Sequence, residues 1–197
     1  MSTEPITVLL CGVGGQGTIL AADLLAHSAQ AAGYEVKLSE VHGMAQRGGA
    51  VTTIVRFGEK VSAMVTDEGC ADVVIAFETT EALRNISYLK ADGKLLVNDE
   101  TKKPLPVLTG KMEMPPDARG TLTKLGASLV PATKIAREIG NEKCSNVVLL
   151  GALANEVGIG KSFWEAQIET RLPARLTEIN LTAFRAGFAY EEEAGLQ

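Results

Sequence analysis

Two glycine-rich loops near the N-terminus constrain most strongly how this chain can fold. The first, GVGGQG at residues 12–17, follows the continuous apolar run ITVLLC at residues 6–11. The second, HGMAQRGG at residues 42–49, follows a strand-like segment at residues 34–41. A buried strand followed by a glycine turn is typical of open α/β sheets, which bind ligands at the carboxyl ends of their strands. We therefore expect the two loops to lie at one edge of the sheet, after neighbouring strands.

Composition and charge narrow the class of protein. The chain has 197 residues, 46% of them hydrophobic and 5% aromatic, which is enough for an aliphatic core. Its net charge of −5, without a basic cluster, argues against a nucleic-acid partner. The sequence shows neither a signal-peptide pattern nor an apolar run of about 18 residues, which predicts a cytoplasmic protein with no membrane partner. Three scattered cysteines without a Cys-x-x-Cys pair predict no metal site in this chain.

Hydrophobic periodicity and turn signals predict one α/β domain over residues 1–197, a Rossmann-like, mostly parallel open sheet flanked by helices. Strands are expected at 6–11, 34–41, 50–57, 72–77, 94–98 and 128–130, and helices at 18–32, 79–89 and 133–139. A tight turn at 58–60 predicts a β-hairpin between 50–57 and 61–65. Residues 99–127, which contain four prolines, are expected to form an irregular excursion.

The C-terminal third, at about residues 146–191, is predicted to be helical. Asn146 is expected to cap its first helix, a capping box at Ser162 to start the second, and Pro173 to open the third. The segment VVLLGALA at residues 147–154 is apolar on every side. A helix of this kind is either enclosed by its own domain or buried at a subunit interface, and the sequence leaves both alternatives open.

The first glycine loop admits two interpretations. Gly12, Gly14 and Gly17 match G-x-G-x-x-G, with Gly15 and Gln16 between them. An acidic residue about 20 positions further on binds the ribose in dinucleotide-binding folds, and Glu40 is close to that spacing. This reading predicts a stand-alone oxidoreductase that binds NAD or FAD. The alternative, which we favour, is that these glycines only allow strand, turn and helix to pack closely.

The second loop carries more chemistry than a simple connection needs. His42, Gln46 and Arg47 lie there together with Gly48 and Gly49. Polar side chains at the carboxyl edge of a sheet tend to contact ligands, and the guanidinium fork of Arg47 suits a carboxylate or phosphate. The alternatives are a capped turn with an exposed arginine, or a buried His42 whose hydrogen bonds are satisfied. No hydrolase or Walker motif is present, so no residue of this chain is assigned a catalytic role.

Longer stretches around both loops resemble a known family. GVGGQGTILAADLL at residues 12–25 and SEVHGMAQRGGAVTTIVRFGE at residues 39–59 resemble the gamma-type subunits of the 2-oxoacid:ferredoxin oxidoreductases. The HGMAQRGG form is similar to the indolepyruvate type, in which the corresponding chain is the beta subunit. NDE at residues 98–100 and NVVLLGALA at residues 146–154 also lie where the family has comparable segments.

This resemblance implies a subunit that has no activity alone. The family oxidises a 2-oxoacid, here an aryl pyruvate, with coenzyme A to an acyl-CoA and carbon dioxide, and passes electrons to ferredoxin. Thiamine diphosphate, magnesium and iron–sulfur clusters would belong to a larger partner subunit, and no cofactor to this chain alone. The Rossmann-like domain of the family is not a nicotinamide or flavin site. The two loops and Glu40 would then shape a pocket or face the partner. A non-catalytic interaction module is the remaining alternative.

Overall fold

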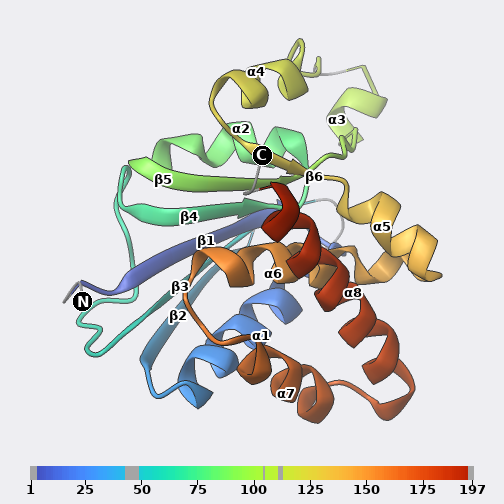
Figure 1. Ribbon diagram of the computed structural model, residues 1–197. Coiled ribbons are helices and arrows are strands. Elements are labelled where there is room, and N and C mark those ends of the chain that lie inside the picture. Colours follow the sequence, from blue (N-terminus) through green and yellow to red (C-terminus); the bar gives the residue numbers. More distant parts are fainter. Residues whose placement is uncertain (1–3, 43–48, 104, 111–112, 195–197) are drawn as a thin grey trace.

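A computed structural model describes residues 4–42, 49–103, 105–110 and 113–194, and these contain a six-stranded sheet in the order β2-β3-β1-β4-β5-β6 (Figure 1). The strands are β1 (Ile6–Val13), β2 (Glu35–His42), β3 (Ala50–Gly58), β4 (Ala71–Ala76), β5 (Leu89–Asn98) and β6 (Ser128–Val130). β1, β4, β5 and β6 pair in parallel, whereas β3 runs antiparallel to both β1 and β2. The prediction of a mostly parallel open sheet is confirmed.

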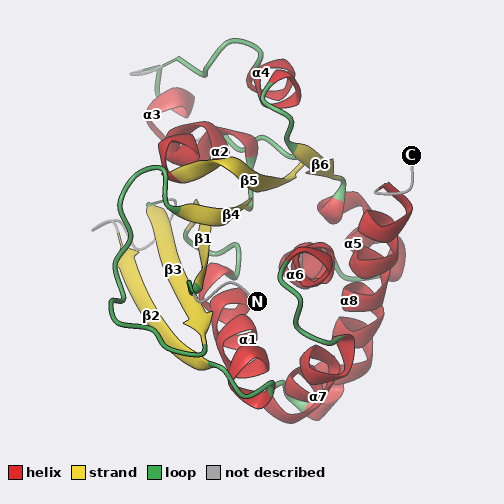
Figure 2. Ribbon diagram, turned by 60° about the vertical axis from the view of Figure 1, so that its left-hand side comes forward, coloured by secondary structure: helices red, strands yellow, loops and turns green. Residues whose placement is uncertain are grey.

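Helices cover both faces of the sheet (Figure 2). One face carries α1 (Thr18–Ala31), α5 (Ala132–Ile139), α6 (Ser145–Glu156), α7 (Lys161–Arg171) and α8 (Ala174–Ala194). The other carries α2 (Thr79–Asn85) and α4 (Ala118–Lys124); the short elements are η1 (Ile86–Tyr88), α3 (Leu105–Leu108) and η2 (Glu142–Cys144). β1 is buried along its length because alternate side chains enter the two cores: Leu10 lies on the α1 face and Leu9 on the α2 face.

The predicted hairpin between residues 50–57 and 61–65 is wrong. Residues 61–65 form no strand, and the antiparallel hairpin of this sheet is instead β2–β3. The reason is that both edges of β3 are already occupied: Phe57 lies opposite Ile6 of β1 on one side and Val36 of β2 on the other. A third neighbour has no free backbone groups to pair with.

Two predicted helix caps are also wrong. α6 begins two residues earlier than expected, at Ser145, because η2 leads directly into it, and Asn146 lies inside the first turn. α7 begins at Lys161 after Gly160, so Ser162 also lies inside the helix. The expected third helix is confirmed, since α8 starts immediately after Pro173.

α6 is enclosed by its own domain, which decides between the two alternatives left open by its apolar sequence. All eight residues of 147–154 are buried, and the helix packs between the sheet and α8. Two glycines allow this close approach. A Cβ at Gly151 would lie 2.1 Å from the carbonyl oxygen of Phe184, and one at Gly187 would lie 1.8 Å from that of Val148.

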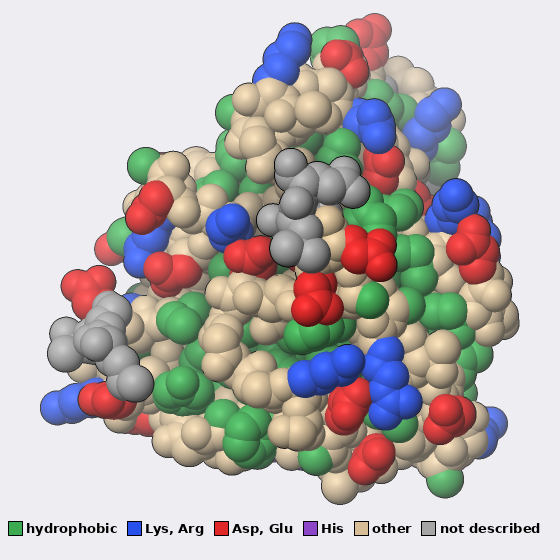
Figure 3. Space-filling model, in the orientation of Figure 1, with side chains coloured by type: hydrophobic (Ala, Val, Ile, Leu, Met, Phe, Trp, Pro, Cys, Tyr) green, Lys and Arg blue, Asp and Glu red, His purple; other side chains and the backbone are tan. Residues whose placement is uncertain are grey.

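The surface carries charge of both signs. Acidic and basic side chains are interspersed over the face shown in Figure 3, with apolar side chains between them. Within the described ranges, no helix is both long and apolar enough to cross a membrane.

Candidate functional site

The first glycine loop and the two described ends of the second, His42 and Gly49, lie at the carboxyl edge of the sheet, although β1 and β2 are not neighbours. The expectation of adjacent strands is wrong because β3 lies between β1 and β2. The start of β3 nevertheless joins the two loops: Ala50 lies opposite Val13 of β1, and Val51 opposite His42 of β2. The Gly14 N–H donates a hydrogen bond of 2.9 Å to the Gly49 carbonyl. A backbone hydrogen bond therefore joins the first loop to the end of the second. Sequence patterns describe side-chain types and do not reveal a bond between backbone groups.

The side chain of Gln16 fills the inside of the first loop. Its Oε1 accepts a hydrogen bond of 2.7 Å from the Val13 N–H, and its Nε2 donates to the Phe77 carbonyl at 3.3 Å. A Cβ at Gly12 would come within 2.7 Å of that Oε1. Gly12 is thus needed for space, and Gln16 ties the end of β1 to the end of β4. Both observations assign a structural role to the residues that match the G-x-G-x-x-G pattern.

Asn146 clamps the first loop onto α6. Its Nδ2 donates to the Gly17 carbonyl at 3.2 Å, and a Cβ at Gly17 would lie 2.4 Å from that nitrogen. Gly17 also has a positive φ of 78° at the start of α1, which glycine adopts without strain. The sequence predicted Asn146 as a helix cap and missed this contact across 129 residues. In the sequence, the one feature that drew attention to Asn146 in this role was the resemblance of the NVVLLGALA segment to the family.

The acidic residue expected at a ribose lies away from the first loop. Glu40 is an exposed residue of the edge strand β2, opposite Thr53 of β3, which in turn lies opposite Leu10 of β1. Two strand spacings, about 10 Å, therefore separate Glu40 from β1. Inserting an antiparallel strand between β1 and β2 removes the adjacency on which a dinucleotide site depends. The side chain of His42 and residues Gln46, Arg47 and Gly48 lie outside the described residues.

A buried polar cluster at the ends of β5 and β6 was not predicted as part of the site. Asn98 Nδ2 donates to Thr133 Oγ1 at 2.9 Å, to the Phe77 carbonyl at 3.3 Å and to Glu100 Oε2 at 3.3 Å. Thr133 Oγ1 also donates to Glu100 Oε2, and the Thr133 N–H donates to Asn98 Oδ1 at 3.3 Å. The NDE segment was noticed only as a point of resemblance. The cluster orients Glu100 toward the same edge as the glycine loops.

Loop, polar cluster and α6 together form a crevice of about 580 Å³. It lies where α1 leaves β1 toward one face of the sheet and α2 leaves β4 toward the other, which is the topological switch point of an open α/β sheet. Its lining is polar apart from Leu20 and Phe77, and comprises Gly15, Gln16, Gly17, Asn98, Glu100, Lys102, Thr133, Glu142, Lys143, Ser145 and Asn146. This volume is in the range of small-molecule sites.

Charges around this crevice are unevenly compensated. Glu142 pairs with Arg137, whose Nε lies 2.8 Å from Glu142 Oε2, and this hydrogen bond lowers the pKa of the Glu142 carboxyl. Glu100 already accepts hydrogen bonds from Asn98 and Thr133. Lys102 and Lys143 form no ion pair with any other described residue, although the charge of Lys102 also lowers the pKa of the Glu142 carboxyl. The crevice therefore carries two ammonium groups beside two carboxylates, Glu100 and Glu142.

Behind the crevice, two buried carboxylates belong to the start of α2. Glu78 caps this helix by accepting from the N–H groups of Thr80 and Glu81, at 3.1 and 2.6 Å. Burial raises the pKa of the Glu81 carboxyl, against the pull of Arg84 at 3.0 Å. Burial, and then the charges of Glu81 and Glu78, raise the pKa of the Cys11 thiol. Cys11 is therefore a core residue rather than a nucleophile.

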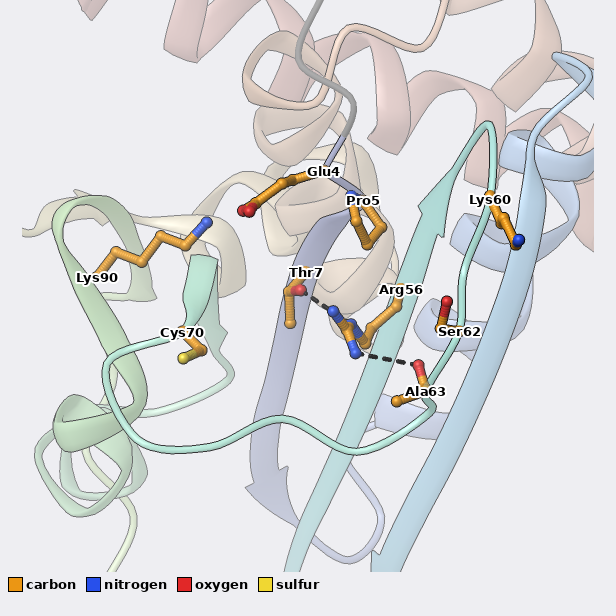
Figure 4. A pocket seen from close by; sticks show the side chains of 9 residues that line it. All are labelled: Glu4, Pro5, Thr7, Arg56, Lys60, Ser62, Ala63, Cys70 and Lys90. Carbon is orange, nitrogen blue, oxygen red and sulfur yellow. Dashed lines mark hydrogen bonds between the residues drawn. The ribbon is translucent and has the colours of Figure 1, made fainter.

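A second hollow of about 520 Å³ at the opposite edge of the sheet has a structural explanation (Figure 4). The Arg56 guanidinium donates to Thr7 Oγ1 at 3.2 Å and to the carbonyls of Ala63 and Val65 at 3.1 Å. Lys90 pairs with Asp72 at 2.5 Å. Arg56 thus holds the segment after β3 against β1, and Lys90 joins β5 to β4, so the crevice at the carboxyl edge is the better candidate site.

The cysteines do not form a metal centre. Cys11 lies in β1 and Cys144 before α6, both buried, whereas Cys70 is exposed before β4. An iron–sulfur cluster needs four ligands, usually thiolates, and the whole chain has three cysteines. In the part of the chain that the structure describes, no group of three or more His, Cys, Asp or Glu side chains is placed to hold a metal ion.

Comparison with known proteins assigns the class. The family model for pyruvate ferredoxin/flavodoxin oxidoreductase matches residues 7–190, so the chain belongs to this family of oxidoreductases. The fold agrees: the gamma subunit of a keto/oxoacid ferredoxin oxidoreductase from Geobacter sulfurreducens superposes with a TM-score of 0.72 at 25% identity, covering 95% of this chain and 99% of that one.

Two relatives are more specific. Indolepyruvate oxidoreductase subunit IorB from Thermococcus kodakarensis is 40% identical, over 96% of this chain and 98% of its own length. The protein of the same name from Methanothermobacter thermautotrophicus is 34% identical, over 95% and 98%. A 2-oxoglutarate:ferredoxin oxidoreductase from Magnetococcus marinus shares the fold, with a TM-score of 0.77 at 21% identity; this chain corresponds to 32% of that longer chain.

Proposed function

We propose that this chain is the small, beta-type subunit of an indolepyruvate:ferredoxin oxidoreductase, which converts aryl pyruvates and coenzyme A to aryl acyl-CoA and carbon dioxide. One observation carries this proposal: four proteins named as IorB subunits are 34–40% identical over more than nine-tenths of this chain. The stand-alone NAD or FAD enzyme is not favoured, because Gln16 fills the glycine loop and Glu40 lies two strands away.

Under this proposal the redox cofactors belong to a larger partner subunit. Thiamine diphosphate with magnesium makes the oxoacid a donor of electrons, and iron–sulfur clusters conduct them to ferredoxin. Too few cysteines are present here to bind a cluster, which supports such a division. The small subunit would be inactive alone and would work in the cytoplasm, beside ferredoxin.

This chain would contribute to the reaction through the carboxyl edge of its β-sheet. The first glycine loop, Gly49 and the crevice lie at that edge, which would close over the cofactor of the partner and exclude water. Within the second loop, Arg47 would bind an anionic group of the oxoacid or of coenzyme A. Replacing Arg47 by Ala should raise the KM for one of these two substrates in the assembled enzyme. Unchanged KM values for both would refute this role.

The proposal is tested by reconstitution. The chain is purified alone and together with the large subunit, and reduction of a viologen dye by indolepyruvate is measured with and without coenzyme A. Activity should require both subunits and both substrates. The proposal is wrong if the large subunit is fully active alone, or if the complex oxidises pyruvate or 2-oxoglutarate but no aryl pyruvate.

A further inference from the structure

We infer that residues 62–65, which follow β3 and cross back over the sheet, dock onto the large, cofactor-bearing subunit of the proposed complex. The inference rests on the proposed function for the existence of that partner and adds where it is bound. We call residues 62–65 the pinned segment, because side chains of the sheet hold its backbone (Figure 4). The segment lies near the amino end of β1, where Arg56 is opposite Thr7, and away from the crevice at the carboxyl edge.

Polar side chains fix the conformation of the pinned segment. The Arg56 guanidinium donates two hydrogen bonds of 3.1 Å to its carbonyls, and the Lys37 ammonium donates one of 3.3 Å. Directly before the segment, the N–H of buried Val61 donates to Glu35 Oε2 at 3.2 Å. Ordering a segment costs conformational entropy, yet all four residues of this one stay exposed. A surface that is already ordered binds a partner at a smaller entropic cost, which favours a docking role.

Two neighbouring apolar side chains of the pinned segment face solvent. Met64 is 53% exposed and Val65 is 65% exposed. Single exposed apolar residues are ordinary, whereas adjoining ones indicate an interaction surface. They lie on the side of β2 and β3 on which, among the described residues, no helix packs. α1 packs on the opposite side of these two strands, and α2 packs on β1, β4 and β5 (Figure 2).

This helix-free side is continuous with the carboxyl edge, which the proposed function places against the partner. Arg56 and Thr52 lie on the same side of β3, and Val41 of β2 is opposite Thr52 and 62% exposed. Four residues of antiparallel strand span about 14 Å. An interface of standard size therefore reaches from the pinned segment to the edge that would close over the cofactor.

Charges beside the pinned segment favour an acidic partner surface. Arg56, Lys60 and Lys90 line the adjoining hollow of about 520 Å³. Glu4 also lines it, and Lys90 is paired with Asp72 at 2.5 Å. Arg56 and Lys60, in contrast, form no ion pair with any described residue. A partner that presents carboxylates around an apolar centre would complement this surface.

Two other occupants fit less well. In a symmetric dimer of this chain the same patch would face itself, so Arg56 and Lys60 would approach their own copies. Ferredoxin receives electrons from clusters that the proposed function assigns to the large subunit. Its encounters are also transient, whereas an exposed apolar pair suits a lasting interface. The large subunit is therefore the occupant that the surface favours.

The affinity of the complete chain for the purified large subunit tests the inference by calorimetry. The variants are Met64→Asp, Val65→Asp and Lys60→Glu, all at exposed positions where substitution leaves the fold intact. Each Asp variant should weaken binding about 10-fold or more, and Lys60→Glu about 3- to 10-fold, with a smaller loss at high salt. Leu125→Asp and Lys134→Glu are matched controls that should bind like the wild type. Leu125 is 52% exposed and Lys134 75% exposed, both far from β2 and β3 (Figure 1).

Hydrogen exchange of the complex provides a second readout that needs no variant. Amides of residues 62–65 should exchange more slowly in the complex than in the free chain, and those of α4 should not change. Equal affinity of all variants, or protection confined to the carboxyl edge, overturns the inference and leaves the proposed function standing. So does a dimer of the chain alone that Val65→Asp dissociates, or a Lys60→Glu complex changed only in its KM for ferredoxin.

Failure of the proposed function is separately visible. A complex that shows the expected sensitivities but oxidises no aryl pyruvate refutes that function and retains the docking surface. If the wild-type chain does not bind the large subunit, both are wrong.

Discussion

Replacing Gly187 by Ala should destabilise the protein, because α6 and α8 touch through this position. A Cβ there would lie 1.8 Å from the Val148 carbonyl oxygen, about 1.6 Å short of ordinary contact. The obstacle is backbone rather than a flexible side chain, so α8 must move as a body. Overpacking of this kind costs about 3 kcal/mol, and the better helix propensity of alanine returns about 1 kcal/mol. We expect a net loss of about 2 kcal/mol in the free energy of unfolding.

Urea unfolding followed by fluorescence measures this loss. Trp164 is the one tryptophan of the chain, buried and stacked on Phe184 of α8 with ring centroids 5.9 Å apart. Its emission therefore reports on the packing of α8, which the substitution disturbs. The midpoint should fall without a change in the denaturant slope, as expected for a native-state effect.

A matched control separates close packing from the general effect of adding a methyl group. Gly160→Ala places a Cβ 3.5 Å from the Phe163 ring, an ordinary contact, and should change stability by no more than about 0.5 kcal/mol. If Gly187→Ala behaved like this control, the helices would not approach as closely as described, and the explanation for the enclosure of α6 would fall.

Three further predictions concern the candidate site. Thr133→Val removes the buried hydroxyl that joins the polar cluster and should cost about 1–3 kcal/mol in urea unfolding, whereas Thr182→Val, at an exposed hydroxyl bonded within α8, should cost little. Burial raises the pKa of the Glu81 carboxyl, so the folded state binds its proton more tightly than the unfolded state does. The free energy of unfolding of the wild type should therefore fall relative to that of Glu81→Gln as pH rises above about 4.3, and a rise would contradict this sign. Gln16→Ala frees the Val13 N–H and should speed its hydrogen exchange; unchanged protection would show that the amide does not hold the loop.

Local patterns in the sequence determined most of the elements. The apolar run at residues 6–11 became β1, and Pro173 directly precedes α8 as expected. Helix and strand periods act over a few residues, so one sequence contains the necessary information. The family resemblance was equally visible, because two long motifs around the loops carry it, and the comparisons confirm it.

Strand order and the site were decided by tertiary structure. Nothing local shows that β3 enters between β1 and β2, an insertion that moves Glu40 away from the glycine loop and excludes a hairpin with residues 61–65. The contact between Asn146 and Gly17 joins residues 129 positions apart. Such pairings depend on which strand edges and cavities remain once the core has packed. A sequence pattern over a few residues contains no information about that packing. The sequence by itself therefore specified the elements and the family, and packing selected which polar groups converge on the crevice.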